Sequence, residues 1–198
     1  VYKLSSSSSG SVTNTNSDII NSSTILVNPV DGDLVFGGWY EDEALTKPIT
    51  TVDTSRGNMT LYGAFYPKDT TLYTVTFNYV TGGGTETSIV YKAPSGNFVI
   101  PDLIEQIHKT GYSFTGWDQG ATGATITISG NIVIEAQYSI NQYTVTFKDG
   151  DTVIKEITAD YGTDISSLIP DDPTKTEYDF TGWSPAAPTT MPATNLLV

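Results

Sequence analysis

Apolar and polar residues alternate along two nearly identical stretches of this chain. Residues 73–77 read Tyr-Thr-Val-Thr-Phe, and residues 143–147 repeat the same five letters. In an extended chain Tyr73, Val75 and Phe77 share one face while the threonines share the other, which is typical of a β-strand with one buried face. The pattern therefore predicts a strand at the same point of two tandem repeats.

A second aromatic motif follows the same organisation. Phe-Thr-Gly-Trp occurs at 114–117 and again at 180–183, and a looser version, Phe-Gly-Gly-Trp, occurs at 36–39. Self-similarity at a nearly constant spacing indicates an array of small units rather than one domain. We predict three repeats, at residues 1–67, 73–138 and 143–198.

The first repeat departs most from the pattern. It lacks the Tyr-Thr-Val-Thr-Phe strand, and residues 5–9 are all serine. Residues 1–4 are interpreted as a degenerate first strand of a complete but divergent repeat, because Pro29 and Trp39 keep the spacing of the third repeat. The alternative is a partial repeat behind a disordered Ser/Asn-rich linker over residues 5–23.

The chain ends in the middle of the pattern as well. It begins without Met, and residues 195–198 correspond only to the start of the last strand of the second repeat. We expect a fragment of a longer polypeptide, whose third repeat lacks the end of its last strand.

Two further elements are expected within a repeat. Residues 148–151 (Lys-Asp-Gly-Asp) have the turn chemistry of a β-hairpin and lead into a second strand at 152–157. Residues 100–107 have proline and aspartate near their start and place apolar residues at helical spacing. In the third repeat Thr163-Asp164 precede a similar apolar set at 165–169, which Pro170 ends. The order predicts an α+β fold: tandem small β-grasp (ubiquitin-like) repeats, mostly β, with one short helix each.

Composition narrows the class of protein. The chain has no Cys, so small cores must be filled by its 12 Tyr, 7 Phe and 3 Trp. Twenty-two acidic residues against nine basic ones give a net charge of −13, which disfavours nucleic acid and anionic lipid as partners. No apolar run is long enough to span a membrane.

The combined motifs resemble a known family of surface repeats. Tyr-Thr-Val-Thr-Phe, a tight turn, a Tyr-Gly step at 161–162 and Tyr-x-Phe-x-Gly-Trp are similar to the Listeria-Bacteroides repeat, the family of the internalin B repeats. The resemblance covers the second and third repeats and, in the first, residues 34–66. It implies a β-grasp fold and an extracellular location, at a bacterial cell surface or in a secreted adhesin. It implies no catalysis and no fixed ligand.

The three Trp residues are the first candidates for a functional site. Indole rings can stack on sugars, but these rings recur at one motif position behind a glycine, which suits a bulge that turns the ring inward. We therefore interpret them as core residues, with a stacking platform as the alternative. The motif residues are Trp39, Trp117, Trp183, Gly38, Gly116 and Gly182.

Four tyrosines are less regular across the repeats and are predicted to be exposed aromatic residues that could contact a ligand. They are Tyr40, Tyr62, Tyr66 and Tyr79.

Other polar residues favour ordinary structural roles. The acidic turns at 31–33, 149–151 and 171–172 lack the alternating oxygen ligands of a calcium loop and suit tight turns. His108 is the only histidine, with no Cys or carboxylate cluster at metal spacing, and is expected to cap a helix or face solvent. We predict no catalytic residue, no metal and no cofactor.

The short connections between repeats limit how far neighbouring repeats can move relative to each other. Only four residues separate Tyr138 from Tyr143, and six separate Tyr66 from Tyr73. Such connections predict a semi-rigid, non-enzymatic stalk or spacer in an adhesin, with neighbouring repeats as its partners and weak adhesive contacts of its own. The alternatives are a module that binds host glycan or protein, and a structural protein that self-associates into filaments through sheet edges.

Overall fold

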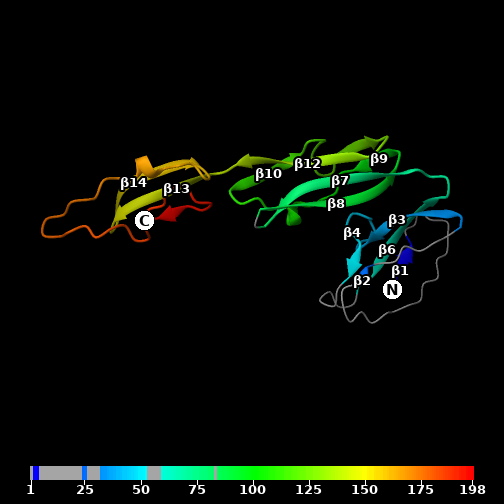
Figure 1. The fold of residues 1–198 in the computed structure, drawn as a ribbon, viewed down its shortest axis with the longest axis horizontal. Coiled ribbons are helices and arrows are strands. Elements are labelled where there is room, and N and C mark those ends of the chain that lie inside the picture. Colours follow the sequence, from blue (N-terminus) through cyan, green and yellow to red (C-terminus); the bar gives the residue numbers. More distant parts are fainter. Residues whose placement is uncertain (1, 5–23, 26–31, 53–58, 83) are drawn as a thin grey trace. The chain divides into compact units, whose positions relative to one another are not determined.

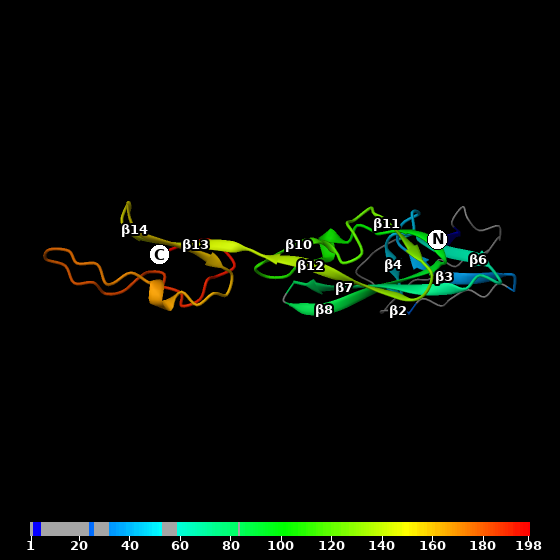
Figure 2. The same cartoon turned by 90° about the horizontal axis from the view of Figure 1, so that it is seen from above.

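The computed structural model describes residues 2–4, 24–25, 32–52, 59–82 and 84–198. These residues form strands and connecting turns, with no α-helix among them (Figures 1 and 2). By contacts, the chain divides into two compact parts. The first comprises residues 1–79, 86–103 and 116–136, and the second comprises residues 80–85, 104–115 and 137–198. This division passes through the second predicted repeat, so the boundaries of the three repeats stay a prediction.

The first repeat contains a four-stranded sheet in the order β1-β6-β3-β4. Its strands are β1 (Tyr2–Leu4), β3 (Leu34–Tyr40), β4 (Pro48–Ile49) and β6 (Leu61–Pro67). A separate antiparallel pair consists of β2 (Thr24–Ile25) and β5 (Thr51–Val52). The predicted degenerate first strand is confirmed over residues 2–4, which pair with β6. The proposed linker at 5–23 lies outside the described residues.

The second repeat is also built on a four-stranded sheet, in the order β10-β12-β7-β8. Its strands are β7 (Leu72–Thr81), β8 (Thr85–Pro94), β10 (Tyr112–Trp117) and β12 (Ile132–Ile140). An antiparallel pair, β9 (Gly96–Val99) and β11 (Thr125–Ile128), completes it. The strand predicted from alternation is confirmed, because Val75 and Phe77 on one face of β7 are fully buried.

The third repeat has a three-stranded sheet in the order β14-β13-β15. The strands are β13 (Gln142–Asp149), β14 (Thr152–Asp160) and β15 (Leu196–Leu197), and Figure 2 shows β13 beside β14. β13 and β14 pair antiparallel around a turn in which Gly150 has a φ of +60°, so the predicted hairpin is confirmed. Residues 178–183, which share the sequence pattern of β10, do not form the strand expected there.

Every repeat joins its first and last strands in parallel. β1 pairs with β6, β7 with β12 and β13 with β15. In the later two repeats an asparagine just before the last strand anchors this pairing. Asn131 Oδ1 accepts a hydrogen bond of 2.9 Å from the Thr74 amide, and Asn195 Oδ1 accepts one of 2.9 Å from the Thr144 amide. Since one residue of slip moves a whole strand to the other face, this contact helps to hold the register.

Small separate cores lie against these sheets. In the third repeat the buried cluster is Val145, Phe147, Ile157, Ile165, Met191 and Val198. In the first repeat it is Trp39, Val52 and Leu61 with Phe36, Ile49 and Met59 packed against them. Aromatic rings contribute to each, as the composition predicted.

The α+β prediction, with one short helix in each β-grasp repeat, is wrong: the described fold consists of β-sheets. The expected helical segments form only single 3-10 turns, η2 (Ile104–Gln106) and η3 (Ser166–Leu168). In the second repeat Leu103 and Ile107 are buried, but Ile104 between them is 56% exposed. One turn is enough to bury both Leu103 and Ile107. A longer helix would be costly to start, because its first turn fixes the backbone of several residues in return for a single hydrogen bond.

Replacing Asn131 with Ala should lower the free energy of unfolding by about 1 kcal/mol, because the Thr74 amide loses its acceptor. Asn131→Asp retains a side-chain oxygen and should stay close to the original stability. Hydrogen exchange of the Thr74 amide, read by NMR, checks both. Equal protection of that amide in the Ala and Asp variants would contradict the anchoring role.

Candidate functional site

The Gly-Trp motif has the same backbone conformation in all three repeats. Gly38, Gly116 and Gly182 have φ values of +136°, +135° and +124°, a region that side chains other than glycine rarely adopt. In the first repeat the ladder between β3 and β6 shifts register between Phe36 and Gly38, as a bulge does. The glycine therefore redirects the chain immediately before the indole.

The indole rings pack edge-to-face against phenylalanine. Trp39 lies 5.2 Å from Phe36 and Trp117 lies 4.8 Å from Phe77, measured between ring centroids. The two indoles are 6% and 4% exposed. Such contacts suit interior rings and leave neither indole available as a flat platform for a ligand.

Trp183 packs against the equivalent phenylalanines of the third repeat, but it is less buried than the other two indoles. Its ring lies 4.9 Å from Phe147 and 5.2 Å from Phe180, also edge-to-face. It is only half-buried, because residues 178–183 are not paired in a sheet. The three tryptophans belong to different repeats.

The four candidate tyrosines are less exposed than predicted. Tyr40 and Tyr79 are 3% and 8% exposed, so their predicted surface position is wrong, while Tyr62 and Tyr66 are half-buried. Tyr40 follows Trp39 in the regularly paired part of β3 and therefore points to the opposite face, where its ring lies 6.4 Å from that of Tyr91. Burial raises the pKa of Tyr40 above its ordinary value, and Tyr66 and Asp42 raise it further.

Tyr91 is a residue that the sequence reasoning missed. Its ring packs edge-to-face on Phe77 at 5.6 Å and on Phe98 at 5.7 Å. Its hydroxyl donates to the backbone oxygen of Thr46, within the same compact part. Thr46 is held in turn by Asp42, whose carboxylate accepts from the Thr46 amide at 3.0 Å. A tyrosine of the second repeat thus docks on a turn of the first.

Tyr161 occupies the matching position of the third repeat, the same distance after Tyr143 as Tyr91 is after Tyr73. Its ring covers Gly111 so closely that a Cβ on this glycine would lie 2.1 Å from the Tyr161 Cδ1 atom. The Tyr112 ring meets it edge-to-face at 6.3 Å. The shared position of Tyr91 and Tyr161 in the repeat was the sequence signal for this contact.

Asn141 is the single residue between β12 and β13, and it binds both sides of the joint. Its amide donates to the Gly111 oxygen at 2.9 Å, and its own carbonyl accepts from the Tyr161 amide at 2.9 Å. Its side-chain Oδ1 accepts from the Ser113 hydroxyl at 2.7 Å. Lys109 reinforces the loop, because its ammonium lies 4.3 Å from the centre of the Tyr112 ring. The name Asn141 joint is used below for Asn141 together with Lys109, Gly111, Tyr112, Ser113 and Tyr161.

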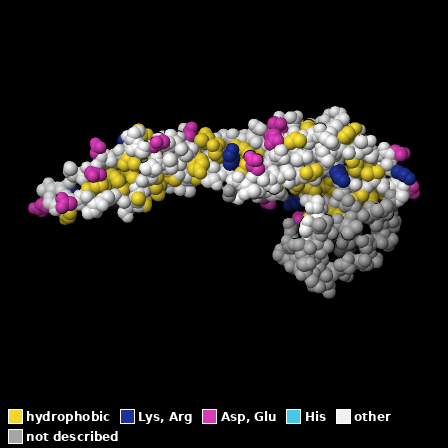
Figure 3. All heavy atoms as spheres, viewed as in Figure 1, with side chains coloured by type: hydrophobic (Ala, Val, Ile, Leu, Met, Phe, Trp, Pro, Cys, Tyr) yellow, Lys and Arg dark blue, Asp and Glu magenta, His cyan; other side chains and the backbone are white. Residues whose placement is uncertain are grey.

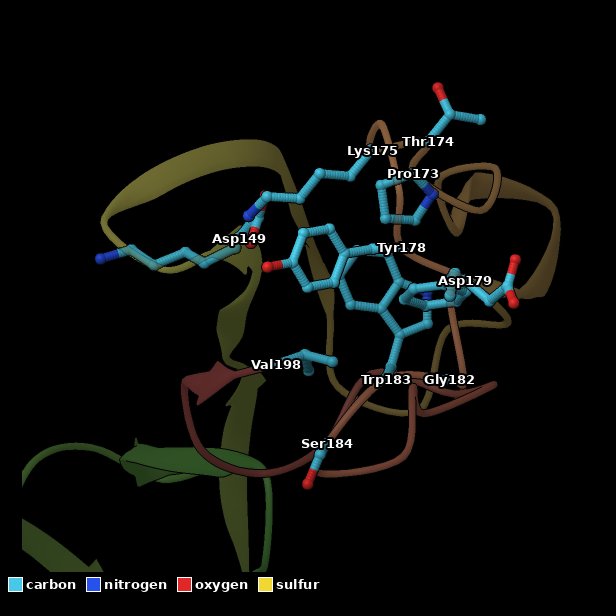
Figure 4. Close-up of a pocket in the computed structure, with 12 residues that line it drawn as sticks. Asp149, Pro173, Thr174, Lys175, Tyr178, Asp179, Gly182, Trp183, Ser184 and Val198 are labelled. Carbon is cyan, nitrogen blue, oxygen red and sulfur yellow. The ribbon is translucent and has the colours of Figure 1, made fainter.

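A cavity of about 310 Å³ lies in the third repeat, between the hairpin turn at 148–149 and residues 173–184. Tyr178 and Trp183 are among the residues that line it, and Figure 4 shows the Lys175 side chain reaching toward Asp149. Lys175 Nζ is 3.5 Å from the Asp149 carboxylate and 5.6 Å from the centre of the Tyr178 ring. Tyr178 is 72% exposed, the most exposed large apolar side chain described.

Residues with metal or acid–base chemistry are scattered. Within the described ranges, no group of three or more His, Cys, Asp or Glu residues could hold a metal ion. His108 is exposed after η2, and its backbone amide donates to the Val80 oxygen. On the face shown in Figure 3, acidic side chains lie scattered rather than gathered in one patch.

The chain belongs to the Listeria-Bacteroides repeat domain family, whose model matches residues 2–63, 73–138 and 143–195. The resemblance inferred from the aromatic motifs is confirmed. The family and the relatives below make the chain a repeat segment of the kind found in surface proteins.

Similar proteins include two from Evansella cellulosilytica. One, named as a candidate membrane protein, is 36% identical over 156 residues, which cover 75% of this chain and 22% of that protein. The other, named as a candidate Gly-rich membrane protein, is 34% identical over 160 residues, which cover 75% of this chain and 17% of that protein.

Internalin H of Listeria monocytogenes is 39% identical over 85 residues, covering 38% of this chain and 14% of internalin H. The chain therefore spans less than a quarter of the length of these relatives. No solved structure matches. Within the part of the chain that is described, no helix has the length and apolar character needed to cross a membrane.

Gly111→Ala should lower stability by more than about 1 kcal/mol, because the new Cβ meets the Tyr161 ring in addition to the cost of a φ of +78°. Gly162→Ala is the matched control, since Gly162 has a φ of +77° but nothing within 4 Å of its added Cβ. Thermal unfolding of both variants isolates the contact. Equal losses in the two variants would show that Tyr161 does not press on Gly111.

The buried pair Tyr40 and Tyr91 should make the protein less stable at alkaline pH. Burial first, then Tyr40 and Asp42, raises the pKa of Tyr91 above its ordinary value of 10.0. A raised pKa favours the neutral phenol in the fold, so this stabilisation is complete below about pH 10 and is lost as the pH rises further. The free energy of unfolding, measured by near-ultraviolet absorbance, should therefore fall as the pH rises above about 10. In the double variant Tyr40→Phe, Tyr91→Phe it should fall less over the same pH range.

Proposed function

We propose that this chain is a non-enzymatic, extracellular spacer segment of a larger surface or secreted adhesin. Its partners in this role are neighbouring repeats of the same polypeptide. The single observation that carries the proposal is the Asn141 joint, because a spacer must transmit position from one repeat to the next. The surface character of the family supports the extracellular location.

The Asn141 joint restrains the connection in several ways at once. A one-residue linker leaves little freedom by itself, and both backbone groups of Asn141 are already bonded to neighbouring repeats. Its side chain adds the bond to Ser113, and Tyr161 fills the space above Gly111. Bending at this point has to break these contacts together, which is a larger cost than rotating a free linker.

The contact of Tyr91 supports the same function at the preceding junction. Tyr91 and Tyr161 hold equivalent positions, and each docks on the repeat before it. The two docking surfaces differ: one is the backbone oxygen of Thr46, and the other is Gly111, a buried glycine that the Tyr161 ring covers. A tyrosine at one position can thus serve successive junctions whose partners vary in sequence.

Two other roles stay predictions. The cavity in the third repeat favours weak adhesive contacts. Self-association would use an edge strand such as β14, where Val153 and Ile154 are exposed.

The spacer role predicts a fixed distance across the Asn141 joint. Because the chain has no Cys, spin labels can be attached at Glu105→Cys and Ser167→Cys, two exposed positions in the second compact part. Pulsed electron paramagnetic resonance should give one narrow distance distribution. Asn141→Gly in the labelled chain should broaden it, because the Ser113 bond is lost and the linker gains backbone freedom.

Ser139→Gly is the matched control, since it adds similar freedom to the end of β12 without touching these bonds. It should leave the distribution narrow. A broad distribution in the unsubstituted labelled chain would contradict the spacer proposal.

A further inference from the structure

The third repeat differs from the others in how it covers its tryptophan. Trp39 and Trp117 are buried and lie within paired strands, β3 and β10, whereas Trp183 is half-buried in a stretch outside any strand. One side of Trp183 packs on Phe147 and Phe180, and the cavity lies beside it. An indole held in a fixed position but partly uncovered is a preformed contact surface.

The exposed ring of Tyr178 belongs to the same cavity. Tyr178 and Trp183 both line the cavity (Figure 4), and Tyr178 is 72% exposed. Two aromatic rings in a concave site form the apolar part of a small-molecule pocket. The volume, about 310 Å³, is near the lower end of the range of roughly 300–1,000 Å³ for such pockets, so it fits one small ring system rather than a chain.

The charged residues of the cavity are balanced. Its lining includes two lysines and two aspartates, and Lys175 is already paired with Asp149; the other two are Lys148 and Asp179. Lys175 also lies over the Tyr178 ring, in the position that a cationic ligand would take. An anionic ligand would meet the two aspartates and a chain of net charge −13.

A purely apolar ligand fits less well than a neutral polar one. It would remove water from the Asp149–Lys175 pair without offering hydrogen bonds in return, which costs free energy. A ligand with an apolar face and several hydroxyls could stack on the rings while its hydroxyls donate to Asp149 and accept from Lys175.

We propose that this cavity binds the neutral pyranose ring of a glycan, stacked between Tyr178 and Trp183 and hydrogen-bonded to Asp149 and Lys175. This binding is independent of the spacer role, because no residue of the Asn141 joint lines the cavity. For a single sugar ring the expected dissociation constant is on the order of 1 mM. Strong attachment would then require several copies acting together.

Heteronuclear NMR of the full chain tests the site. The probes are methyl β-glucopyranoside, methyl β-galactopyranoside and N-acetylglucosamine, with N-acetylneuraminic acid and choline as charged comparators. At least one neutral sugar should shift the indole N–H signal of Trp183 in a saturable way, and the charged probes should bind more weakly. No saturable shift with any neutral sugar at tens of millimolar, or tighter binding of a charged probe, overturns the proposal.

Substitutions locate the site without disturbing the core. Tyr178→Ala should weaken binding about tenfold or more, and Lys175→Met should weaken it while keeping the hydrocarbon stem. Leu168→Ala, an exposed residue of the same repeat outside the cavity, is the control and should leave binding unchanged. Equal binding by the Tyr178→Ala and control chains would also overturn the assignment.

Discussion

Parallel pairing of the first and last strands is the constraint on which each repeat depends. It brings the two ends of the repeat's chain into one sheet and fixes which face of the Val-x-Phe strand turns inward. Only then do Val75 and Phe77, or Val145 and Phe147, meet the rest of a small core. Parallel strands cannot be joined by a tight turn, so the intervening chain is left to carry the variable features.

Those intervening segments explain why similar sequences produce different surfaces. In the second repeat the Phe-x-Gly-Trp stretch is strand β10, paired within the sheet, and Trp117 is covered. In the third repeat the same motif lies outside the sheet, and a cavity stands beside Trp183. The position of one segment thus separates a covered indole from one that borders a cavity.

Much of this fold could be predicted from the alternation of apolar residues and from the turn at Gly150. The helices could not, because Leu103 and Ile107 have helical spacing yet are buried by a single 3-10 turn. The exposure of tyrosines was also misjudged, since burial of Tyr40 depends on Tyr91, which lies far along the chain. Contacts between repeats are hard to predict from the sequence, and the only signal here was that Tyr91 and Tyr161 hold the same position in their repeats.

The parallel closure has a mechanical consequence. In two adjacent parallel strands, the chain enters one strand at one end of the ladder and leaves the other strand at the opposite end. Tension along the polypeptide therefore acts along the strands and loads the hydrogen bonds between β7 and β12 in shear, all at once. A protein tethered at one end and pulled at the other would resist until several bonds fail together, instead of peeling open one by one.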